Sequence, residues 1–215
     1  KILVMTSTFP KGDQYHVPGF VNELCKRLSN DFLIYVLAPY VKGSKREEKW
    51  GNITVVRFKY GFGIKDYFTD KPILPTLSQK RFLWLLVPVF IISQFISMIR
   101  LMREKKIKLI HAHWIIPQGL LAVLYKKFFD DTVEVVLTSH GADLYGLRKF
   151  KFLKKWIIDN SSALTVVSKS MREKVFSWKI NPKIPVKVIP MGVDLHRFHP
   201  NRYNPEIKYK YNVNG

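Results

Sequence analysis

The chain has 215 residues, 47% of them hydrophobic, which is enough to build the core of one α/β domain. Its formal net charge of +20 is extreme for a domain of this size. Such a charge predicts an anionic partner: nucleic acid, a phosphate-bearing substrate or an acidic membrane surface. The single cysteine, Cys25, excludes an internal disulfide and fits a reducing compartment. The first residues run directly into a strand pattern rather than a signal peptide, so we expect a cytoplasmic protein.

Strand and helix patterns alternate along the whole chain. Strands are predicted at residues 2–5, 32–38, 53–58, 109–113, 133–137, 163–167 and 186–189. Helices are predicted at residues 19–28, 81–103, 118–129, 145–156 and 168–178, whereas residues 41–50 are expected to be a charged surface loop and residues 60–75 an irregular connection. This alternation predicts a single doubly wound, mostly parallel sheet with helices on both faces.

The first predicted helix begins at a glycine. Gly19 would let a ligand approach the free backbone N–H groups of the helix, and the helix dipole favours phosphate there. The surrounding glycines form neither a dinucleotide-binding fingerprint nor a P-loop. Phe20, Leu24 and Leu28 recur at four-residue spacing, which predicts that they form the buried face. Cys25 is expected to be a small core residue rather than a nucleophile.

Residues 82–99 carry no charge and are flanked by basic residues on both sides. That length approaches the length of a transmembrane helix. Pro88, Ser93 and Gln94 interrupt the apolar run, and a strand of the same sheet follows at once, so we expect a crossover helix instead. Two alternatives remain: a helix with one face near a membrane, or a wholly buried helix. Residues 147–156 mix basic and aromatic side chains, which indicates either an anionic surface partner or lysines lying over the protein's own core.

Polar and ionisable residues follow two apolar strands without a spacer. One stretch reads VVLTSHGADLY and ends in His140 and Asp143, and the other reads KLIHAHW and carries His111 and His113. The carboxyl edge of a parallel sheet is where open α/β folds bind ligands. We therefore expect these four residues to lie together at one edge of the sheet. The alternative is that they merely cap the helix that follows.

Three histidines at neighbouring strand ends raise the question of a metal. His111 and His113 are two residues apart and therefore share one side of a strand, so a three-ligand zinc site is conceivable. Their spacing matches no known ligand pattern, and no dedicated fourth group is evident. We prefer the hypothesis that one histidine, with a pKa near neutrality, serves as a proton or hydrogen-bond partner for a substrate. No metal site is predicted.

Five stretches of the chain together resemble a known family. In order they are TSTFPKGDQYHVPGFVNEL, KLIHAHWIIPQG, TSHGADLY, ALTVVSKSM and VKVIPMGVDLHRFHP. This succession resembles the amino-terminal half of family-4 retaining glycosyltransferases, which have the GT-B architecture of two facing Rossmann-like domains. The most specific stretch, IPMGVDLHRFHP, is similar to the family's I-P-N-G-V-D-x-x-x-F-x-P, with Met191 in place of asparagine.

The resemblance implies roles for individual residues. His140 matches the family histidine beneath the donor sugar and is the predicted catalytic residue. His111 and His113 match residues that line the floor of the cleft, and Gly19 roughly matches a loop that meets donor phosphate or acceptor, although Pro18-Gly19 replaces the usual glycine pair. Asp143 follows the form H-G-x-D and is a predicted donor-binding residue.

The resemblance also implies what surrounds the chain. Residues 1–200 would form the GT-B N-terminal Rossmann-like domain, and residues 201–215 a linker or the start of a C-terminal domain that grips the nucleotide. The expected partners are a nucleotide-sugar donor, an unknown acceptor, the missing C-terminal domain and an anionic membrane surface on the inner face of the membrane. No cofactor, no metal and no nucleic acid are expected.

The implied function is transfer of a sugar from a nucleotide-sugar to a hydroxyl acceptor with retention, in cell-surface polysaccharide or glycolipid synthesis. Without the C-terminal domain, this chain alone is expected to be inactive. Two alternatives stay open: half of a sugar-nucleotide epimerase of the same fold, and a non-catalytic module that docks on a membrane or a partner. A nucleic-acid-binding protein would rest on charge only.

Overall fold

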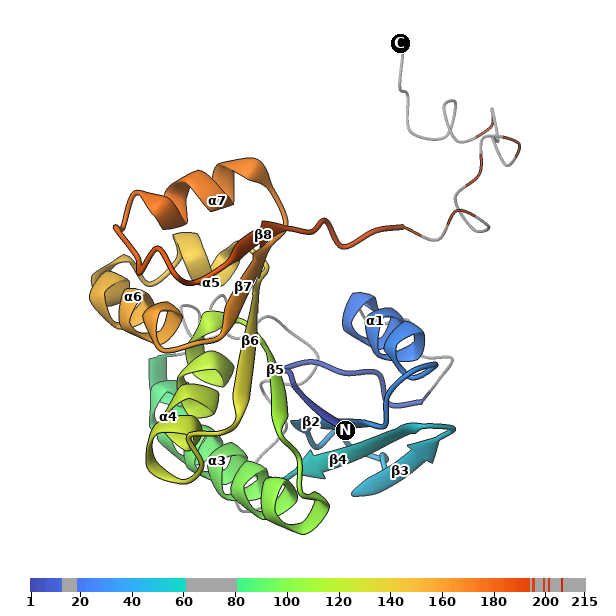
Figure 1. Ribbon diagram of the computed structural model, residues 1–215. Coiled ribbons are helices and arrows are strands. Elements are labelled where there is room, and N and C mark those ends of the chain that lie inside the picture. Colours follow the sequence, from blue (N-terminus) through green and yellow to red (C-terminus); the bar gives the residue numbers. More distant parts are fainter. Residues whose placement is uncertain are drawn as a thin grey trace.

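The computed structural model describes residues 1–12, 19–60 and 81–193, with Leu195, His199, Asn201 and Glu206 beyond them. Predictions for residues 13–18 and 61–80, and for most of the tail at 201–215, lie outside the described residues. An eight-stranded sheet organises the described part, in the order β3-β4-β2-β1-β5-β6-β7-β8 (Figure 1). The strands are β1 (Ile2–Met5), β2 (Ile34–Pro39), β3 (Glu47–Trp50), β4 (Ile53–Phe58), β5 (Leu109–His113), β6 (Glu134–Ser139), β7 (Ala163–Val166) and β8 (Val186–Val188).

Every strand pairing in the sheet is parallel except the one between β3 and β4. The order changes direction at β1, which pairs with β2 on one side and with β5 on the other. Such a reversal is a topological switch point, and the carboxyl ends of the strands beside it form the usual ligand site of open α/β sheets. The predicted doubly wound, mostly parallel sheet is confirmed.

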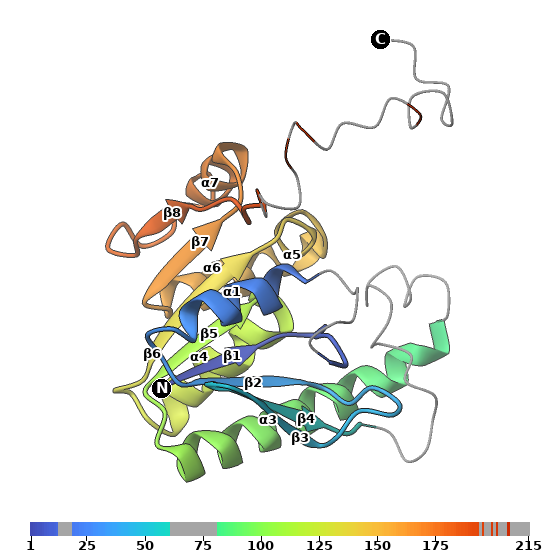
Figure 2. The ribbon, with the colours of Figure 1, turned by 90° about the vertical axis from the view of Figure 1, so that its right-hand side faces the viewer.

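Helices cover both faces of the sheet, but unequally. The elements are α1 (Phe20–Leu28), η1 (Arg81–Leu85), α3 (Leu86–Lys105), η2 (Ile115–Gly119), α4 (Leu120–Phe128), α5 (Ala142–Tyr145), η3 (Arg148–Phe150), α6 (Lys151–Asp159) and α7 (Lys169–Phe176). Helices α3, α4, α6 and α7 share the larger core cluster, whereas α1 packs over β1, β2 and β4 in a separate one (Figures 1 and 2). Right-handed crossovers account for this division, because α1 leads the chain in the opposite direction along the sheet.

Helix α3 runs antiparallel to the strands that it covers. Near its beginning, Phe90 packs against Phe58 at the end of β4, with the ring centroids 5.1 Å apart. At its end, the carbonyl of Lys105 accepts a hydrogen bond from Nζ of Lys1, next to the start of β1, over 2.8 Å. The beginning of α3 therefore lies toward the carboxyl edge of the sheet, and its end lies at the amino edge.

Two local expectations were wrong. The charged stretch at residues 41–50 contains β3, an antiparallel edge strand whose Glu47 and Lys49 face solvent. In α1 the fully buried hydrophobic residues are Val21 and Cys25, and the predicted face of Phe20, Leu24 and Leu28 is only half-buried. An edge strand such as β3 need not show an apolar alternation. In α1 the buried face lies one residue further along than predicted, and Phe20 and Leu28 stand at its border.

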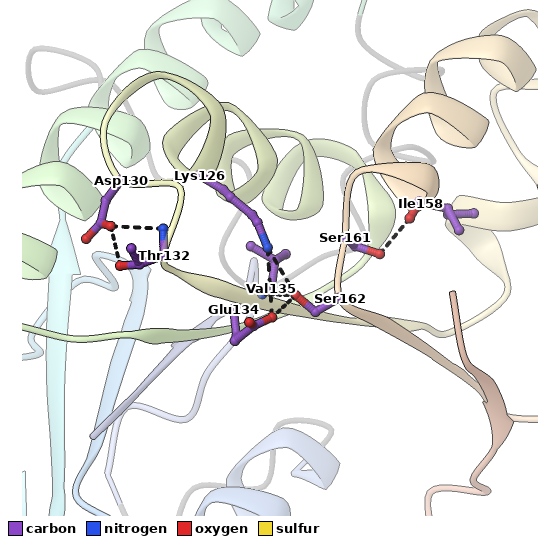
Figure 3. A network of polar contacts seen from close by, with 8 residues as sticks. All are labelled: Lys126, Asp130, Thr132, Glu134, Val135, Ile158, Ser161 and Ser162. Carbon is purple, nitrogen blue, oxygen red and sulfur yellow. Dashed lines mark hydrogen bonds and ion pairs between the residues drawn. The ribbon is translucent and has the colours of Figure 1, made fainter. Parts of the chain in front are cut away.

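A network of polar contacts links the elements at the amino edge of the sheet (Figure 3). Oγ of Ser162 accepts a hydrogen bond from the backbone N–H of Val135 over 3.0 Å and also contacts Glu134, which pairs with Lys126. Asp130 accepts hydrogen bonds from the backbone and side chain of Thr132 at the turn before β6. These contacts join α4 and the end of α6 to the start of β6, so this edge is used for structure.

Candidate functional site

Two histidines from neighbouring strands meet at the carboxyl edge of the sheet. His113 is the last residue of β5, and His140 directly follows β6, which pairs with β5 in parallel register. Nδ1 of His113 lies 3.0 Å from Nε2 of His140, and the two ring planes differ by only 9°. The rings therefore share an in-plane hydrogen bond. The predicted meeting of His113 and His140 at one edge is confirmed in position.

A buried carboxylate holds the backbone on both sides of this pair. Asp143, only 4% exposed, accepts a hydrogen bond from the backbone N–H of Ile115 over 2.8 Å with one oxygen. Its other oxygen accepts from Oγ of Ser139 and from the backbone N–H of His140, over 2.9 and 3.2 Å. Asp143 thus ties the end of β5 to the end of β6. These contacts give it a positioning role, because both oxygens are engaged by the chain itself.

A polar row extends from the pair across the face of the sheet on which α1 lies. Nε2 of His111 lies 2.7 Å from Oγ1 of Thr138, and that oxygen lies 2.7 Å from Oγ1 of Thr165. These three side chains come from β5, β6 and β7 in turn. His111 packs beside His113 with their ring centroids 4.4 Å apart, so the three predicted histidines form one group.

The histidines are held in their neutral form. Burial lowers the pKa of His111 to about 4, with a further contribution from His140. Burial also lowers the pKa of His113 well below its usual range and, more moderately, that of His140, which the charge of Asp143 partly offsets. At neutral pH the group therefore presents imidazoles that donate and accept single hydrogen bonds and carry no charge. Nε2 of His113 is buried without a partner among the described residues.

The start of α1 reaches this group from the other side. Gly19 is the N-cap of α1, and no side chain among the described residues caps this helix start, where the first N–H groups could meet a ligand. The next residue, Phe20, packs on His140, with the ring centroids 4.8 Å apart. Gly19 is therefore the sequence neighbour of a residue that contacts the histidine pair, and its predicted contact with donor phosphate or acceptor stays a prediction.

Trp114, for which the sequence predicted no role, lies beside His140. The two ring centroids are 5.0 Å apart, and the Trp114 backbone has φ 76°, a conformation that is costly for a bulky residue. Its backbone N–H donates to the carbonyl of Thr138 over 2.8 Å, which helps to fix the conformation. The sequence signal that could have indicated Trp114 was its position directly after the H-x-H of β5.

The same geometry bears on the metal question. Across residues 1–12, 19–60 and 81–193, no group of three or more His, Cys, Asp or Glu side chains is arranged to hold a metal ion. The closest ring nitrogens of His113 and His140 are directed at each other instead of at a common centre. Metal independence remains a prediction.

The fold defines the class of architecture: it matches one Rossmann-like half of the GT-B fold. The model of the family described as Glycosyltransferase Family 4 matches residues 19–197, which include every element from α1 to β8. The chain belongs to Glycosyltransferase Family 4. A comparison with curated protein sequences found no match.

Solved structures show the same fold at low sequence identity. A sucrose-phosphate synthase from Thermosynechococcus elongatus is 13% identical, with a TM-score of 0.63 over 99% of this chain and 99% of that one. HepE of Anabaena, solved in complex with UDP-glucose, is 11% identical, with a TM-score of 0.58 over 98% of this chain and 49% of that one. The chain therefore spans about half the length of HepE. A UDP-N-acetylglucosamine 2-epimerase from Rickettsia bellii is also similar, at 11% identity and a TM-score of 0.53.

Proposed function

We propose that this chain is the acceptor-side domain of a retaining glycosyltransferase that moves a sugar from a nucleotide-sugar to a hydroxyl acceptor. The observation that carries the proposal is the neutral His113–His140 pair at the carboxyl edge of the sheet, next to the uncapped start of α1. The family match supports glycosyl transfer over epimerisation. Synthesis of a cell-surface polysaccharide or glycolipid in the cytoplasm is the setting that we propose for it.

Sugar transfer of this kind requires two contributions from the protein. The bond between the sugar's anomeric carbon and the phosphate oxygen breaks, and the nucleoside diphosphate leaves with the electron pair. The acceptor oxygen then bonds to the same carbon, on the same face, and its proton passes to the departing phosphate oxygen. The protein must neutralise the growing charge on the diphosphate and must orient the sugar.

His140 suits the orienting role. Its Nε2 is engaged by His113, so its ring direction is fixed, and its Nδ1 has no hydrogen-bond partner among the described residues. A neutral imidazole held in this way offers one directed hydrogen bond to a sugar hydroxyl. Asp143 and His113 act as positioning residues, since they hold the backbone and the ring of His140.

The first turn of α1 suits the phosphate role. Helix N-termini bind anions through free N–H groups and the helix dipole. That contribution is modest for one helix, on the order of 1 kcal/mol. The main neutralisation would therefore come from a second domain, which agrees with a chain that spans about half the length of HepE. We propose that no metal ion takes part.

The first test compares the 215-residue chain with a longer protein in which a C-terminal nucleotide-binding domain is joined to it. Both are mixed with a panel of UDP-, GDP- and ADP-sugars, and donor binding and sugar transfer are measured. We expect transfer only from the two-domain protein. Donor affinity in the micromolar range or better for the chain alone, about −8 kcal/mol, would contradict the need for a second domain.

The second test addresses the site. In the two-domain protein His140→Ala should lower kcat by at least about tenfold, because a preorganised hydrogen bond to the reacting sugar is lost. Phe176→Ala, on the exposed side of α7, is the matched control and should leave turnover unchanged. Equal turnover in His140→Ala and wild type would reduce His140 to a structural role.

Stoichiometric zinc retained by untagged protein after EDTA treatment would contradict metal independence.

A further inference from the structure

The outer face of α3 and of the turn before it is apolar. Leu85, Val89, Ile92 and Ile96 are exposed, up to 80% at Leu85 and 61% at Ile96. Their spacing of four, three and four residues places them in a single line along the helix, which we call the outer stripe. Trp84, also exposed, lies at its beginning. Helix α3 runs along the outside of the molecule (Figure 2).

The opposite face of the same helix is apolar apart from the buried Gln94. Phe90, Met98, Leu101 and Met102 are buried in the larger core cluster against the sheet. A helix that is hydrophobic all round is normally covered all round, by protein or by lipid. The segment Leu83–Lys105 is long and apolar enough to cross a membrane by length and composition, yet only 28% of its apolar 18-residue window is buried. The outer stripe therefore calls for a cover.

The residues around the outer stripe indicate which kind of partner covers it. Phe95 packs on Phe129, with the ring centroids 5.9 Å apart, and Phe128 beside it is 70% exposed, so the apolar surface continues onto the end of α4. Exposed cations border this surface: Arg103 lies over the ring of Phe129, and Lys106 and Lys127 are exposed nearby in sequence. From residue 81 to residue 108 Glu104 is the only acidic residue, and it is paired with Arg100.

We propose that the outer stripe docks on an anionic lipid surface, with its apolar side chains among the acyl chains and the bordering cations at the head groups. The net charge of +20 favours this occupant over a second copy of the chain, which would carry the same charge. Docking of this kind does not depend on glycosyl transfer, so the two proposals can fail separately.

The helix lies on the lipid and does not span it. Spanning would pull Phe90, Met98 and Met102 away from the sheet and open the core. Because α3 runs antiparallel to the strands, the outer stripe occupies the half of the helix toward the carboxyl edge of the sheet. That is also the edge of the histidine pair. Docking would place this edge beside the lipid, with the histidines on the face of the sheet opposite α3, and would suit an acceptor carried by a lipid.

Vesicle co-sedimentation of the 215-residue chain tests the proposal. The vesicles are pure phosphatidylcholine, or phosphatidylcholine mixed with phosphatidylglycerol, at 0.1 M and 1 M salt. We expect at least about tenfold more binding to the anionic vesicles at low salt. Most of it should be lost at high salt, because the Debye length falls from about 10 Å to about 3 Å.

Paired variants separate the apolar and the charged contributions. Ile92→Ser with Ile96→Ser should weaken anionic-vesicle binding by at least about tenfold, since two large apolar side chains no longer enter the lipid. Phe176→Ser, exposed on α7 at the far end of the sheet, is the control for lost apolar surface (Figure 1). Arg103→Gln with Lys106→Gln should weaken binding severalfold, against Lys174→Gln with Lys183→Gln as the control of equal charge.

Three results would overturn the proposal. If the chain bound no vesicle, phosphate-bearing substrates instead of lipid would account for its positive charge. Salt-resistant partitioning into neutral vesicles would mean that the helix inserts or spans. A dimer in sedimentation velocity that the Ile92→Ser, Ile96→Ser variant dissociates, without vesicle binding by the wild type, would assign the outer stripe to a second copy of the chain.

Discussion

The buried ammonium of Lys154 donates a hydrogen bond to the carbonyl of Leu144 over 3.0 Å and contacts the carbonyl of Gly146 as well. Lys154 is only 1% exposed, and its Nζ also lies over the ring of Trp178, 5.8 Å from its centroid. Burial lowers its pKa, whereas the charge of Asp143 raises it. Lys154 therefore fastens the end of α5, the short helix whose first turn holds Asp143.

Replacing this lysine should loosen the site as well as the fold. Lys154→Met removes the donor for two carbonyls and should lower the free energy of unfolding by about 2–4 kcal/mol. Urea denaturation measures the loss. Lys151→Met, exposed one turn earlier on α6, is the control and should change stability by less than about 0.5 kcal/mol. Equal stability of the Lys154 variant and wild type would contradict a structural role.

The neutral histidines make the fold sensitive to acid. His111 has a pKa of about 4 in the folded protein, against an ordinary value of 6.5. Below pH 6.5 the unfolded chain therefore binds a proton that the folded chain does not, and the free energy of unfolding falls as the pH falls. Between pH 7 and pH 5 the loss from His111 is about 2 kcal/mol.

Urea midpoints measured at several pH values from 7.5 to 5.0 test this expectation above the range in which most carboxylates titrate. His111→Gln keeps a hydrogen-bonding group for Thr138 but cannot be protonated, so its stability should fall less steeply over the same range. A parallel decline in the variant and the wild type would show that other groups cause the acid sensitivity.

Gly141, between His140 and α5, occupies a backbone conformation that side chains rarely adopt, with φ +100°. Gly141→Ala should cost about 1–3 kcal/mol of stability and should lower turnover in the two-domain protein, because the His140 backbone would shift. Gly12→Ala is the control, since an added methyl group there meets nothing within 4 Å. Thermal unfolding of both variants gives the comparison, and an unaffected Gly141 variant would show that the turn adapts.

Cys25 should be chemically silent in the folded protein. Its side chain is fully buried between α1 and the sheet, and burial raises the pKa of its thiol to about 12. Because the thiolate is the reactive form, a thiol reagent such as DTNB should label the native chain very slowly and the urea-unfolded chain fast. Rapid native labelling would mean that α1 opens readily from the sheet.

The sequence predicted the positions of the histidines because parallel strands bring their carboxyl ends to one edge. His113 and His140 each end an apolar run, and that local signal is enough to place them together. The family resemblance supplied the expected role of His140, and the geometry adds its fixed ring direction. The alternation of strands and helices from β4 to β8 likewise followed from the patterns, except that α5, η3 and α6 stand where one helix was predicted at residues 145–156.

Other features depend on contacts that no local pattern contains. Lys154 is charged and lies among basic residues, so the sequence suggested a solvated or snorkelling side chain, whereas the ends of α5 supply buried acceptors for it. Phe20 belongs to an apolar spacing and borders the core under α1, but its ring also packs on His140, which no local pattern indicates. The positive φ of Trp114 results from the turn into η2 and the hydrogen bond to Thr138.

The antiparallel edge strand β3 affects how protein molecules interact when they are crowded on a surface. Molecules held on a membrane diffuse in two dimensions and meet edge to edge, where an open strand could recruit a neighbour's strand. At this edge Glu47 and Lys49 face outward, and Glu48 is drawn inward to the buried Arg57, 3.7 Å from its Nε. Charges of both signs on so short a strand make continuous pairing with another sheet unfavourable. On the membrane surface that we propose, this border strand would keep crowded neighbours separate and their carboxyl edges open.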